Sequence, residues 1–481
     1  MRKKKMEVLS DIEKNNDVYS LKYKKTDVWP IFKTSLFFFN HKNSDAPIKP
    51  VFYIKILKKT GKFLFLNFFY SFILRIRVLN SLKKTDYIFA GYHAHRTFYE
   101  NKSMNKFFDP IMDFLENEMS AKTISFEHEF SGIQKLYYKK KRVLNVSRLI
   151  SYYRTLVKKD KFESNILDGA IDIYSKKTNL NKIDLKEKID LDLNEIFFWK
   201  NLWIDILDKT NPKAVFTLCY YNPKLFGLIL AANEKNICTV DIQHGSQGKY
   251  QPCYSFSNYK KSNSLPNVFW VWDSTSKLSL ENIFKEKEQK VIVGGNPWID
   301  FLSQNSNEQL TETRKIILHS LQPGLDIILS ETILQSIKST DEDYVWYLRL
   351  HPRMTKRELN VIKKLVIDNN IQHKVVIDLA TSLPLPLILR STFALVSHYS
   401  GVLIEAYLCG VPINIVIDLM GAQTYSEYLD DGKMEYLDLD LDLNYFNEIK
   451  KIEDKKCFSV QSNSNEDKDY FSGLVQLFNS L

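Results

Sequence analysis

Short apolar runs alternate with longer amphipathic stretches along the chain from about Asp86 onward. This alternation is typical of parallel β-strands joined by crossover helices, so it predicts an α/β fold. In the first half of the chain the apolar runs predict strands at 87–91, 123–126, 214–218 and 238–242. The charged, lysine-rich segment 136–199 has a helical period and predicts helices between the second and third of these strands.

A second series of apolar runs follows the polar segment 243–264, which contains two glycines and a proline. These runs predict strands at 268–272, 291–294, 316–320, 345–350, 375–378, 394–397 and 413–416. The pattern therefore predicts a first domain at 1–266, a second domain at 267–430 and a tail at 431–481. We expect the tail to pack a helix back toward the first domain. Its Leu-Asp repeat at 437–443 is compatible with a turn or with a strand.

Composition agrees with two domains in a reducing compartment. A chain of 481 residues with 44% hydrophobic residues can bury two cores. Its five cysteines form no CxxC pair, and an odd number suits a reducing compartment better than a disulfide framework. No apolar stretch reaches the roughly 18 residues that a membrane span needs, and the first residues do not resemble a signal peptide. We expect a cytoplasmic protein.

The positive charge is concentrated near the N-terminus. Residues 1–84 contain 19 Lys and Arg against six Asp and Glu, and they include the apolar, aromatic run 63–78. This run predicts either peripheral binding to an anionic membrane at the inner face of the cytoplasmic membrane or a buried helix with a basic flank. Nucleic acid is a weaker alternative, and we expect no nucleic-acid partner, because the sequence contains no recognisable nucleic-acid module.

Two doubly wound domains in series predict a central cleft between the carboxyl ends of their sheets, where ligands of such sheets bind. The polar residues that follow strands are therefore candidates for the site. In the second domain His351 and Arg353 follow one strand, and both side chains can donate hydrogen bonds to phosphate. A structural histidine that satisfies a backbone carbonyl is the alternative.

Another strand of the second domain is followed by His398, Ser400 and Gly401, and then by a helix that contains Glu405. Backbone N–H groups at such a helix start can bind phosphate, and Glu405 can accept hydrogen bonds from two ribose hydroxyls. A surface glutamate is the alternative. Three further strand-exit residues are weaker donor-binding candidates, because a plain turn explains them nearly as well: Gly295, Asn296 and Gln322.

In the first domain His244 follows the strand at 238–242 and precedes a glycine. A histidine there can act as the base that takes a proton from an acceptor hydroxyl, or it can be a core histidine at the domain junction. His93 and His95 are candidates for acceptor binding, and Glu127 and Glu129 are alternative bases. We expect no metal site, because no third ligand has a diagnostic spacing.

The ordered motifs QHGS (243–246), GGNPWID (294–300), SLQP (320–323), RLHPR (349–353) and SHYSGVLIEAYLCGVP (397–412) resemble those of bacterial capsule and teichoic-acid transferases. These enzymes include CDP-glycerol glycerophosphotransferase-like proteins, and the His-Pro and Ser-rich pair is similar to that of sialyltransferases and polysialyltransferases. The resemblance covers roughly 211–425. It implies the GT-B fold, two Rossmann-like doubly wound domains that face a central cleft, with no cofactor or metal.

By this resemblance His351, Arg353, His398 and Ser400 hold the donor phosphates, Glu405 holds the ribose and His244 is the base. One departure is that the acidic base motif of the sialyltransferases is absent from the first domain, since Asp430-Asp431-Gly432 lies in the second. The donor sugar therefore stays open.

The residues and the resemblance together predict a glycosyltransferase of cell-envelope biosynthesis. It would transfer a sugar from a nucleotide-activated donor to a capsule polysaccharide, a lipopolysaccharide or another lipid-linked glycan acceptor. Three alternatives stay open: a CDP-polyol phosphotransferase, a nucleotide-sugar 2-epimerase and a non-catalytic glycan-binding scaffold.

Overall fold

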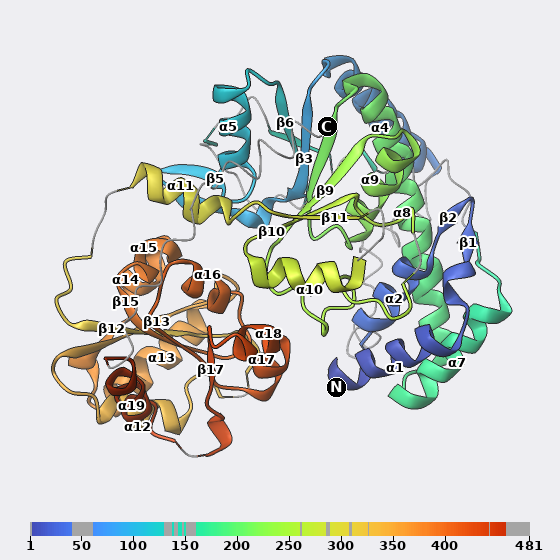
Figure 1. Ribbon diagram of the computed structural model, residues 1–481. Coiled ribbons are helices and arrows are strands. Elements are labelled where there is room, and N and C mark those ends of the chain that lie inside the picture. The colour runs from blue at the N-terminus through green and yellow to red at the C-terminus, as the bar shows by residue number, and fades with distance from the viewer. Residues whose placement is uncertain are drawn as a thin grey trace. The chain divides into compact units, whose positions relative to one another are not determined.

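The structure is a computed structural model, shown in Figure 1, and it describes residues 2–40, 61–128, 137–138, 143–146, 149–150, 160–259, 262–284, 289–306, 310–325, 327–441 and 443–457. The chain divides into two compact units, the first reaching Gly294 and the second beginning at Gly295. Each unit is built on its own parallel sheet.

The first unit contains a seven-stranded sheet in the order β11-β10-β9-β8-β3-β6-β7, in which all neighbours are parallel. Its strands are β3 (Tyr87–Tyr92), β6 (Thr123–His128), β7 (Val143–Asn145), β8 (Ala214–Leu218), β9 (Cys238–Ile242), β10 (Val268–Val271) and β11 (Lys290–Val293). The order reverses between β3 and β8, as in doubly wound sheets.

The helices of the first unit are α1 (Arg2–Asn15), α2 (Trp29–Phe38), α4 (Gly61–Ser81), α5 (Asp109–Glu118), α7 (Asn165–Thr178), α8 (Lys182–Thr210), α9 (Pro223–Glu234) and α10 (Ser274–Phe284), with η1 (Val18–Ser20) and η3 (His93–His95). The described part of this unit also contains two antiparallel hairpins: β1 (Lys22–Tyr23) with β2 (Thr26–Asp27), and β4 (Arg96–Tyr99) with β5 (Lys102–Asn105). Gly227 allows helices α8 and α9 to pack closely, because a Cβ atom at this position would lie only 2.6 Å from Cβ of Trp199.

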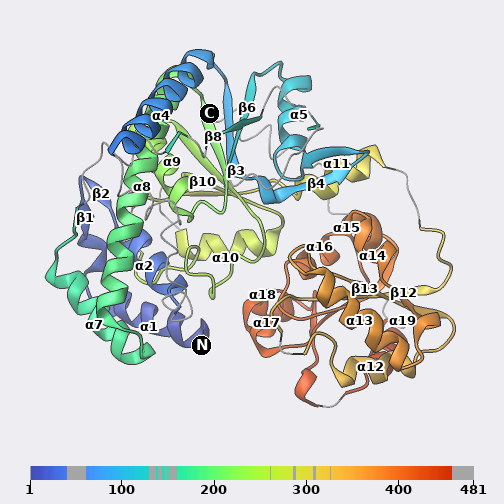
Figure 2. The ribbon, with the colours of Figure 1, turned by 180° about the vertical axis from the view of Figure 1, so that it is seen from behind.

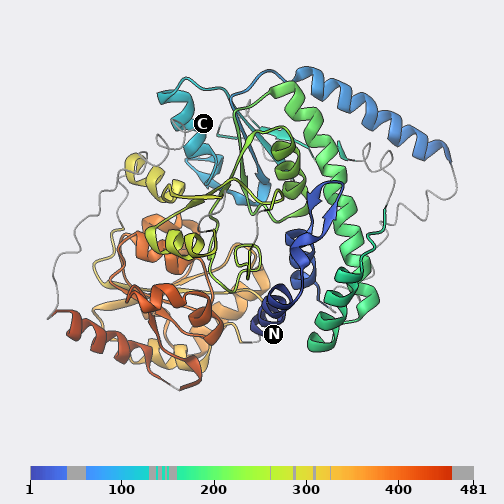
Figure 3. The ribbon, with the colours of Figure 1, turned by 45° about the vertical axis from the view of Figure 1, so that its right-hand side comes forward.

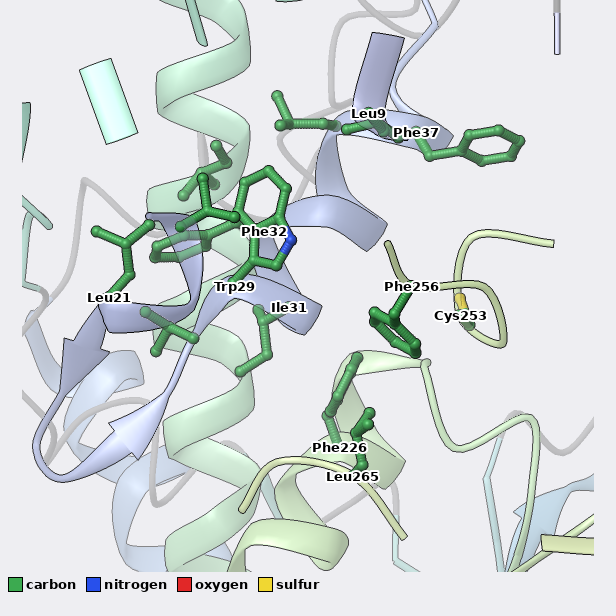
Figure 4. Close-up of a cluster of buried hydrophobic side chains, with 14 of the residues drawn as sticks. Leu9, Leu21, Trp29, Ile31, Phe32, Phe37, Phe226, Cys253, Phe256 and Leu265 are labelled. Carbon is green, nitrogen blue, oxygen red and sulfur yellow. The ribbon is translucent and has the colours of Figure 1, made fainter. Parts of the chain in front are cut away.

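The N-terminal helices α1 and α2 pack against α7 and α8 (Figure 3). Their side chains form a second core in the first unit (Figure 4). Trp29 and Phe32 of α2 are fully buried in this core, which also contains Phe256 and Phe226. A buried carboxylate, Glu13, fixes this layer, and it accepts hydrogen bonds from four groups. They are Lys33 Nζ at 2.8 Å, Trp29 Nε1 at 2.9 Å, Tyr19 Oη at 3.1 Å and the backbone N of Ser257 at 2.8 Å.

The second unit contains a six-stranded parallel sheet in the order β14-β13-β12-β15-β16-β17. The strands are β12 (Lys315–Ser320), β13 (Tyr344–Arg349), β14 (Val375–Val376), β15 (Thr392–Ser397), β16 (Ile413–Val416) and β17 (Glu435–Tyr436). Its order reverses between β12 and β15. The two sheets confirm the predicted fold class of two Rossmann-like domains.

The helices of the second unit are α11 (Pro297–Asn305), α12 (Glu331–Lys338), α13 (Lys356–Asp368), α14 (Asp378–Ser382), α15 (Leu385–Leu389), α16 (Val402–Leu408), α17 (Leu419–Thr424), α18 (Ser426–Asp430) and α19 (Tyr445–Cys457), with η5 (Gln372–Lys374) and η6 (Leu439–Leu441). Figure 2 shows this unit from behind. Apolar side chains of α12, α13 and α19 share one core with one face of the sheet.

The boundary between the units differs from the one that the sequence predicts. The strands β10 and β11 belong to the first sheet, because β10 pairs with β9, so the first unit extends to Gly294 rather than to residue 266. The described part of the tail also differs. Tyr445 and Ile449 of α19 are buried in the core of the second unit, and the tail beyond Cys457 lies outside the described residues.

Both ends of every strand predicted from an apolar run lie within two residues of the observed ends, and β8, β9 and β16 match in full. The short strands β7 and β17 and both hairpins are not predicted, because two to four residues carry little periodic signal. The Leu-Asp repeat contains the short helix η6, and residue 442 within it lies outside the described residues.

The apolar run near the N-terminus forms α4, which has one face on the core and another in solvent. Leu79 is buried, and Leu74 and Val78 pack against the core that α8 and α9 share. Phe69 and Ile73 are 49% and 50% exposed. They are four residues apart and so share one helical face. Exposed apolar and basic side chains on one helix are typical of helices that lie on a membrane surface.

Not every lysine of the basic stretch can contact lipid. Lys5 is buried, and its Nζ donates hydrogen bonds to the backbone oxygens of Phe37 and Phe39 at 2.9 and 2.5 Å. In the part of the chain that the structure describes, no helix is long and apolar enough to cross a membrane.

If α4 binds membranes, Phe69→Ser with Ile73→Ser should reduce binding to vesicles that contain anionic lipid, because each change removes apolar area from the lipid. Cosedimentation measures the bound fraction, and Leu191→Ser, at a position of α8 that is also 50% exposed, is the control. Binding should weaken in a salt-dependent way when five lysines are neutralised and the buried Lys5 is kept: Lys3, Lys4, Lys58, Lys59 and Lys62. Vesicle binding that survives both sets of changes would refute membrane association through this region.

Candidate functional site

In the second unit, polar residues end the two strands at which the strand order reverses. Ser320 ends β12 and Ser397 ends β15, and their Oγ atoms are 2.5 Å apart. The preceding residue of β12, His319, is buried, and its Nδ1 lies 2.9 Å from the backbone oxygen of Val396. Burial and the nearby His398 lower the pKa of His319 to about 3, so its imidazole is neutral.

His398 follows β15 directly and lies beside a carboxylate. Its ring centroid is 6.1 Å from that of His319, and its Nδ1 is 3.4 Å from Oδ2 of Asp418. Asp418 follows β16, and its other oxygen accepts a hydrogen bond from the backbone N of Gly421 and thereby caps α17. A carboxylate that is fixed in this way orients the imidazole ring.

The predicted residues Ser400, Gly401 and Glu405 lie next along the chain. Oγ of Ser400 accepts a hydrogen bond from the backbone N of Val402 at 3.4 Å, and Gly401 is the first residue before α16. Glu405 is 9% exposed. Its carboxylate lies near the guanidinium of Arg349. Burial lowers the pKa of Arg349 to about 10, and the charge of Glu405 opposes this shift to a smaller extent.

His351 and Arg353 lie in a turn after β13. The ring Nδ1 of His351 accepts a hydrogen bond from the backbone N of Arg353 at 3.1 Å, and the Arg353 side chain is exposed. The adjacent Arg349 ends β13, and its Nη1 donates to the backbone oxygens of Ala380 and Leu383 at 2.5 and 2.9 Å. Of the two arginines, only Arg353 therefore presents its guanidinium to solvent.

Of the three weaker donor-binding candidates, Gly295 and Asn296 have structural roles. Gly295 has a φ of 74° at the boundary between the units, a conformation that favours glycine. Asn296 caps α11, because its Oδ1 accepts from the backbone N atoms of Trp298 and Ile299 at 3.1 and 3.3 Å. Gln322 is half-buried in the loop after β12. A role for these three in binding stays a prediction.

In the first unit, four histidines lie at the carboxyl ends of three strands of the same sheet. His93 and His95 follow β3, His128 ends β6 and His244 follows β9. Ring centroids of His95 and His244 are 4.9 Å apart, and the ring of Phe107 lies 5.9 Å from the first and 5.4 Å from the second. The structure thus brings predicted acceptor and base residues together.

His244 sits on a loop that its neighbour Gln243 holds in place. Nε2 of Gln243 donates to the backbone oxygen of Gly245 and to Oγ of Ser276, each at 3.0 Å, and its Oε1 accepts from the backbone N of Trp272 at 2.6 Å. Desolvation by the surrounding protein and the charge of Lys106 lower the pKa of His244 to about 4. The side chain of His244 also reaches solvent.

Two of the four histidines have polar atoms that are buried without a hydrogen-bond partner among the described residues. They are Nδ1 of His95 and both ring nitrogens of His128. Burial lowers the pKa of both side chains, to about 3 for His128 and well below the usual value for His95. Native proteins usually satisfy such atoms with ordered water or a ligand.

The structure argues against Glu127 as a base. Its carboxylate is fully buried, and Arg96 Nε donates to Oε2 at 2.8 Å while Asn105 Nδ2 donates to Oε1 at 3.2 Å. Both carboxylate oxygens are thus committed to donors within the protein. Glu129 lies outside the described residues. Nε2 of His93 lies 3.4 Å from Oη of Tyr137, so His93 is held in the same hairpin region.

A buried aspartate holds the loop that follows β8. Oδ1 of Asp241 accepts from the backbone N of Tyr220 and from Oγ1 of Thr217, each at 3.0 Å, and Oδ2 accepts from Oη of Tyr254 at 2.7 Å. Burial outweighs these hydrogen bonds and raises its pKa to about 7. Cys219 in the same loop has a φ of 61°, so the loop is strained and depends on this anchor.

The sequence did not single out six residues that the structure places at the two sheet edges: His128, Asp241, His319, Ser320, Ser397 and Asp418. A signal exists for some of them, because His319, Ser320 and Ser397 are polar residues at the ends of apolar strands. No group of three or more His, Cys, Asp and Glu residues that could hold a metal ion occurs in the described segments.

Comparisons with solved structures identify the fold. A protein of Listeria monocytogenes assigned as a UDP-N-acetylglucosamine 2-epimerase matches with a TM-score of 0.50 and 13% identity, over 83% of this chain and 96% of its own. The S. aureus protein MnaA, solved with UDP, matches with a TM-score of 0.50 and 14% identity, over 82% and 95%. The glycosyltransferase of kitacinnamycin matches with a TM-score of 0.44 and 9% identity, over 83% and 96%.

No protein-family model and no curated protein sequence matches the chain. At these identities the likeness shows the fold alone. The fold is the GT-B type, with two Rossmann-like domains that contain sheets of seven and six strands.

The raised pKa of Asp241 predicts a pH dependence of stability. Its pKa is 3.8 when unfolded and about 7 when folded, so between these values the folded chain binds more protons and the free energy of unfolding falls as pH rises. Asp241 should contribute a slope of at most about 1.4 kcal/mol per pH unit. Asp241→Asn keeps the size and the acceptor oxygen and should remove this contribution.

Urea denaturation of the full chain between pH 4 and pH 8 measures the slope in both forms, and their difference isolates Asp241. The same pH dependence in the unsubstituted chain and in Asp241→Asn would show that this carboxyl titrates normally.

Proposed function

We propose that the chain is a glycosyltransferase that transfers a sugar from a nucleotide-activated donor to a bacterial surface polysaccharide or a lipid-linked glycan. The donor nucleotide binds the second unit, and the acceptor hydroxyl is deprotonated by a histidine of the first. The motifs that resemble capsule and teichoic-acid transferases support this choice of substrates.

The observation that carries the proposal is the polar cluster where the strand order of the second sheet reverses. Ligands of doubly wound sheets bind outside the carboxyl ends of the strands at such a point. Ser397 and Ser320 end the two strands there, His398 follows beside Asp418, and Glu405 is buried one element further on. Hydroxyls and an imidazole N–H suit a diphosphate, and a carboxylate suits ribose hydroxyls.

His244 is the group that we assign to the acceptor. Its imidazole is neutral near pH 7, which is the form that accepts a proton, and its lowered pKa makes it a weaker base than a free histidine. The ion pair of Glu127 with Arg96 removes one competing base from the proposal.

An epimerase that acts on a nucleotide sugar is the second candidate, and one observation favours it. The two structural matches with a TM-score of 0.50 are described as a UDP-N-acetylglucosamine 2-epimerase and as a complex with UDP. Such an enzyme uses a nucleotide sugar but transfers nothing to an acceptor.

A panel of CMP-, CDP-, UDP- and GDP-linked sugars, with CDP-glycerol, distinguishes the candidates. A glycosyltransferase releases nucleotide faster when an acceptor glycan is added, and an epimerase converts its donor to the 2-epimer without an acceptor. Release of CMP from CDP-glycerol would identify a polyol phosphotransferase. Absence of turnover with every donor would leave the non-catalytic scaffold and contradict the proposal.

Nucleotide binding should weaken in His398→Ala and in Glu405→Ala, because each removes a polar contact to phosphate or ribose that is expected to contribute about 1 kcal/mol or more. Calorimetric titration with UDP measures the affinity, and His351→Ala tests the neighbouring strand end in the same way. Two matched controls in the second unit are His373→Ala and Glu342→Ala, whose side chains are exposed. Unchanged affinity in His351→Ala, His398→Ala and Glu405→Ala would move the donor site elsewhere.

Turnover should fall by about a hundred- to ten-thousandfold in His244→Ala, while donor affinity stays near that of the unsubstituted chain. The rate of the unsubstituted enzyme should fall as pH drops through the pKa of His244, below the usual histidine value, since only the neutral imidazole accepts a proton. Single-turnover rates against pH measure both effects. If the fall in rate at low pH persists in His244→Ala and disappears in Glu129→Gln, the base is Glu129 and not His244.

A further inference from the structure

The carboxyl edge of the first sheet contains a lysine that packs beside two histidines. Nζ of Lys106 lies 5.0 Å from the ring centroid of Phe107. The same ring is 5.9 Å from the ring of His95 and 5.4 Å from the ring of His244. The positive charge of Lys106 also contributes to the lowered pKa values of both histidines, so it acts on both rings.

The nearby carboxylates are committed to another cation. Arg96 donates to Glu127 at 2.8 Å and lies 3.7 Å from Asp109, and the side chains of all three are at most 3% exposed. Over the ranges that the structure describes, Lys106 has no ion pair, and its side chain is half-buried. Among the described residues, this half-buried cation therefore has no carboxylate partner beside the residues that we assign to the acceptor.

A second, independent feature points to the same place. Nδ1 of His95 is buried, and it has no hydrogen-bond partner within the described segments. Both nitrogens of His128, whose ring contacts Tyr92 at 5.2 Å, share this property, and the ring of His95 lies 5.9 Å from the same tyrosine. Unsatisfied polar atoms in one cluster mark a site that water or a ligand completes.

We propose that Lys106 and His95 form an anion-binding site in the first unit, and that it holds a phosphate group of the acceptor while His244 receives the acceptor hydroxyl. Lysine is a compact positive charge that binds phosphate, and a neutral imidazole can donate one hydrogen bond to it. The assignment of this phosphate group to the acceptor rests on the proposed function, whereas the existence of the anion-binding site does not depend on it.

Titration of the full chain with inorganic phosphate, followed by ³¹P NMR in saturating UDP, tests the site. UDP fills the proposed nucleotide site, so the remaining phosphate binding reports on the first unit. Lys106→Met should weaken phosphate binding by about tenfold or more, because a charge-assisted contact is lost. Lys106→Arg should retain most of it, and this variant also shows that the position tolerates change.

Lys102→Met is the matched control. Lys102 lies on the same hairpin and its Nζ is also near an aromatic ring, that of Tyr138 at 5.9 Å, but it is exposed. Its phosphate affinity should equal that of the unsubstituted chain. Equal phosphate affinity in Lys106→Met and in the unsubstituted chain would overturn the proposal, and so would complete displacement of phosphate by UDP.

The two proposals fail in different ways. If the chain does not bind UDP, the nucleotide site of the second unit is wrong, and the comparison of Lys106→Met with Lys102→Met in phosphate alone still decides the anion site. If UDP binds and phosphate affinity does not depend on Lys106, only the anion site is wrong.

Discussion

The reversal of strand order in each parallel sheet is the constraint on which the candidate sites depend. Crossover connections are right-handed, so helices from the two halves of a sheet leave in opposite directions at the reversal point and leave the strand ends there uncovered. In the first sheet this point lies between β3 and β8, and in the second between β12 and β15. Polar residues gather at the carboxyl edges of these sheets, and two of them, His244 and Arg353, have side chains exposed to solvent.

The two edges differ in the way that they hold polar groups. The edge of the second sheet pairs its groups with one another, as in Ser320 with Ser397 and His398 with Asp418. At the edge of the first sheet, ring nitrogens of His95 and His128 are buried and have no hydrogen-bond partner among the described residues. Pairing fixes side chains before a ligand arrives, whereas unsatisfied atoms gain hydrogen bonds when it does. This contrast is consistent with a preorganised nucleotide site in one unit and an acceptor site in the other.

The sequence predicts the α/β fold and most long strands, because strands buried on both faces form continuous apolar runs. The boundary between the units cannot be predicted in this way, because the sequences of β10 and β11 do not indicate which of the two sheets these strands join. Strand exits such as His244 and His398 are visible from the sequence. Asp418 and Asp241 are not, because their roles depend on contacts with His398 and Tyr254 across neighbouring elements.

The hairpin of β4 and β5 shows what the sequence pattern leaves out. Four-residue strands give no clear period, yet this hairpin contributes Arg96, which binds Glu127, and leads into Lys106. A glutamate that follows a strand therefore looks like a base in the sequence and is an ion-paired structural residue in the fold.

Hydrogen exchange of the full chain with and without UDP tests the central claim most directly, because it locates the nucleotide without a substitution. Binding at the reversal point predicts slower exchange at the carboxyl ends of the second sheet, in segments 319–323, 349–353 and 397–405. The amino ends of the same strands, near Lys315 and Tyr344, should exchange as in the free chain. Protection confined to those amino ends, or to the first unit, would contradict a donor site at this edge.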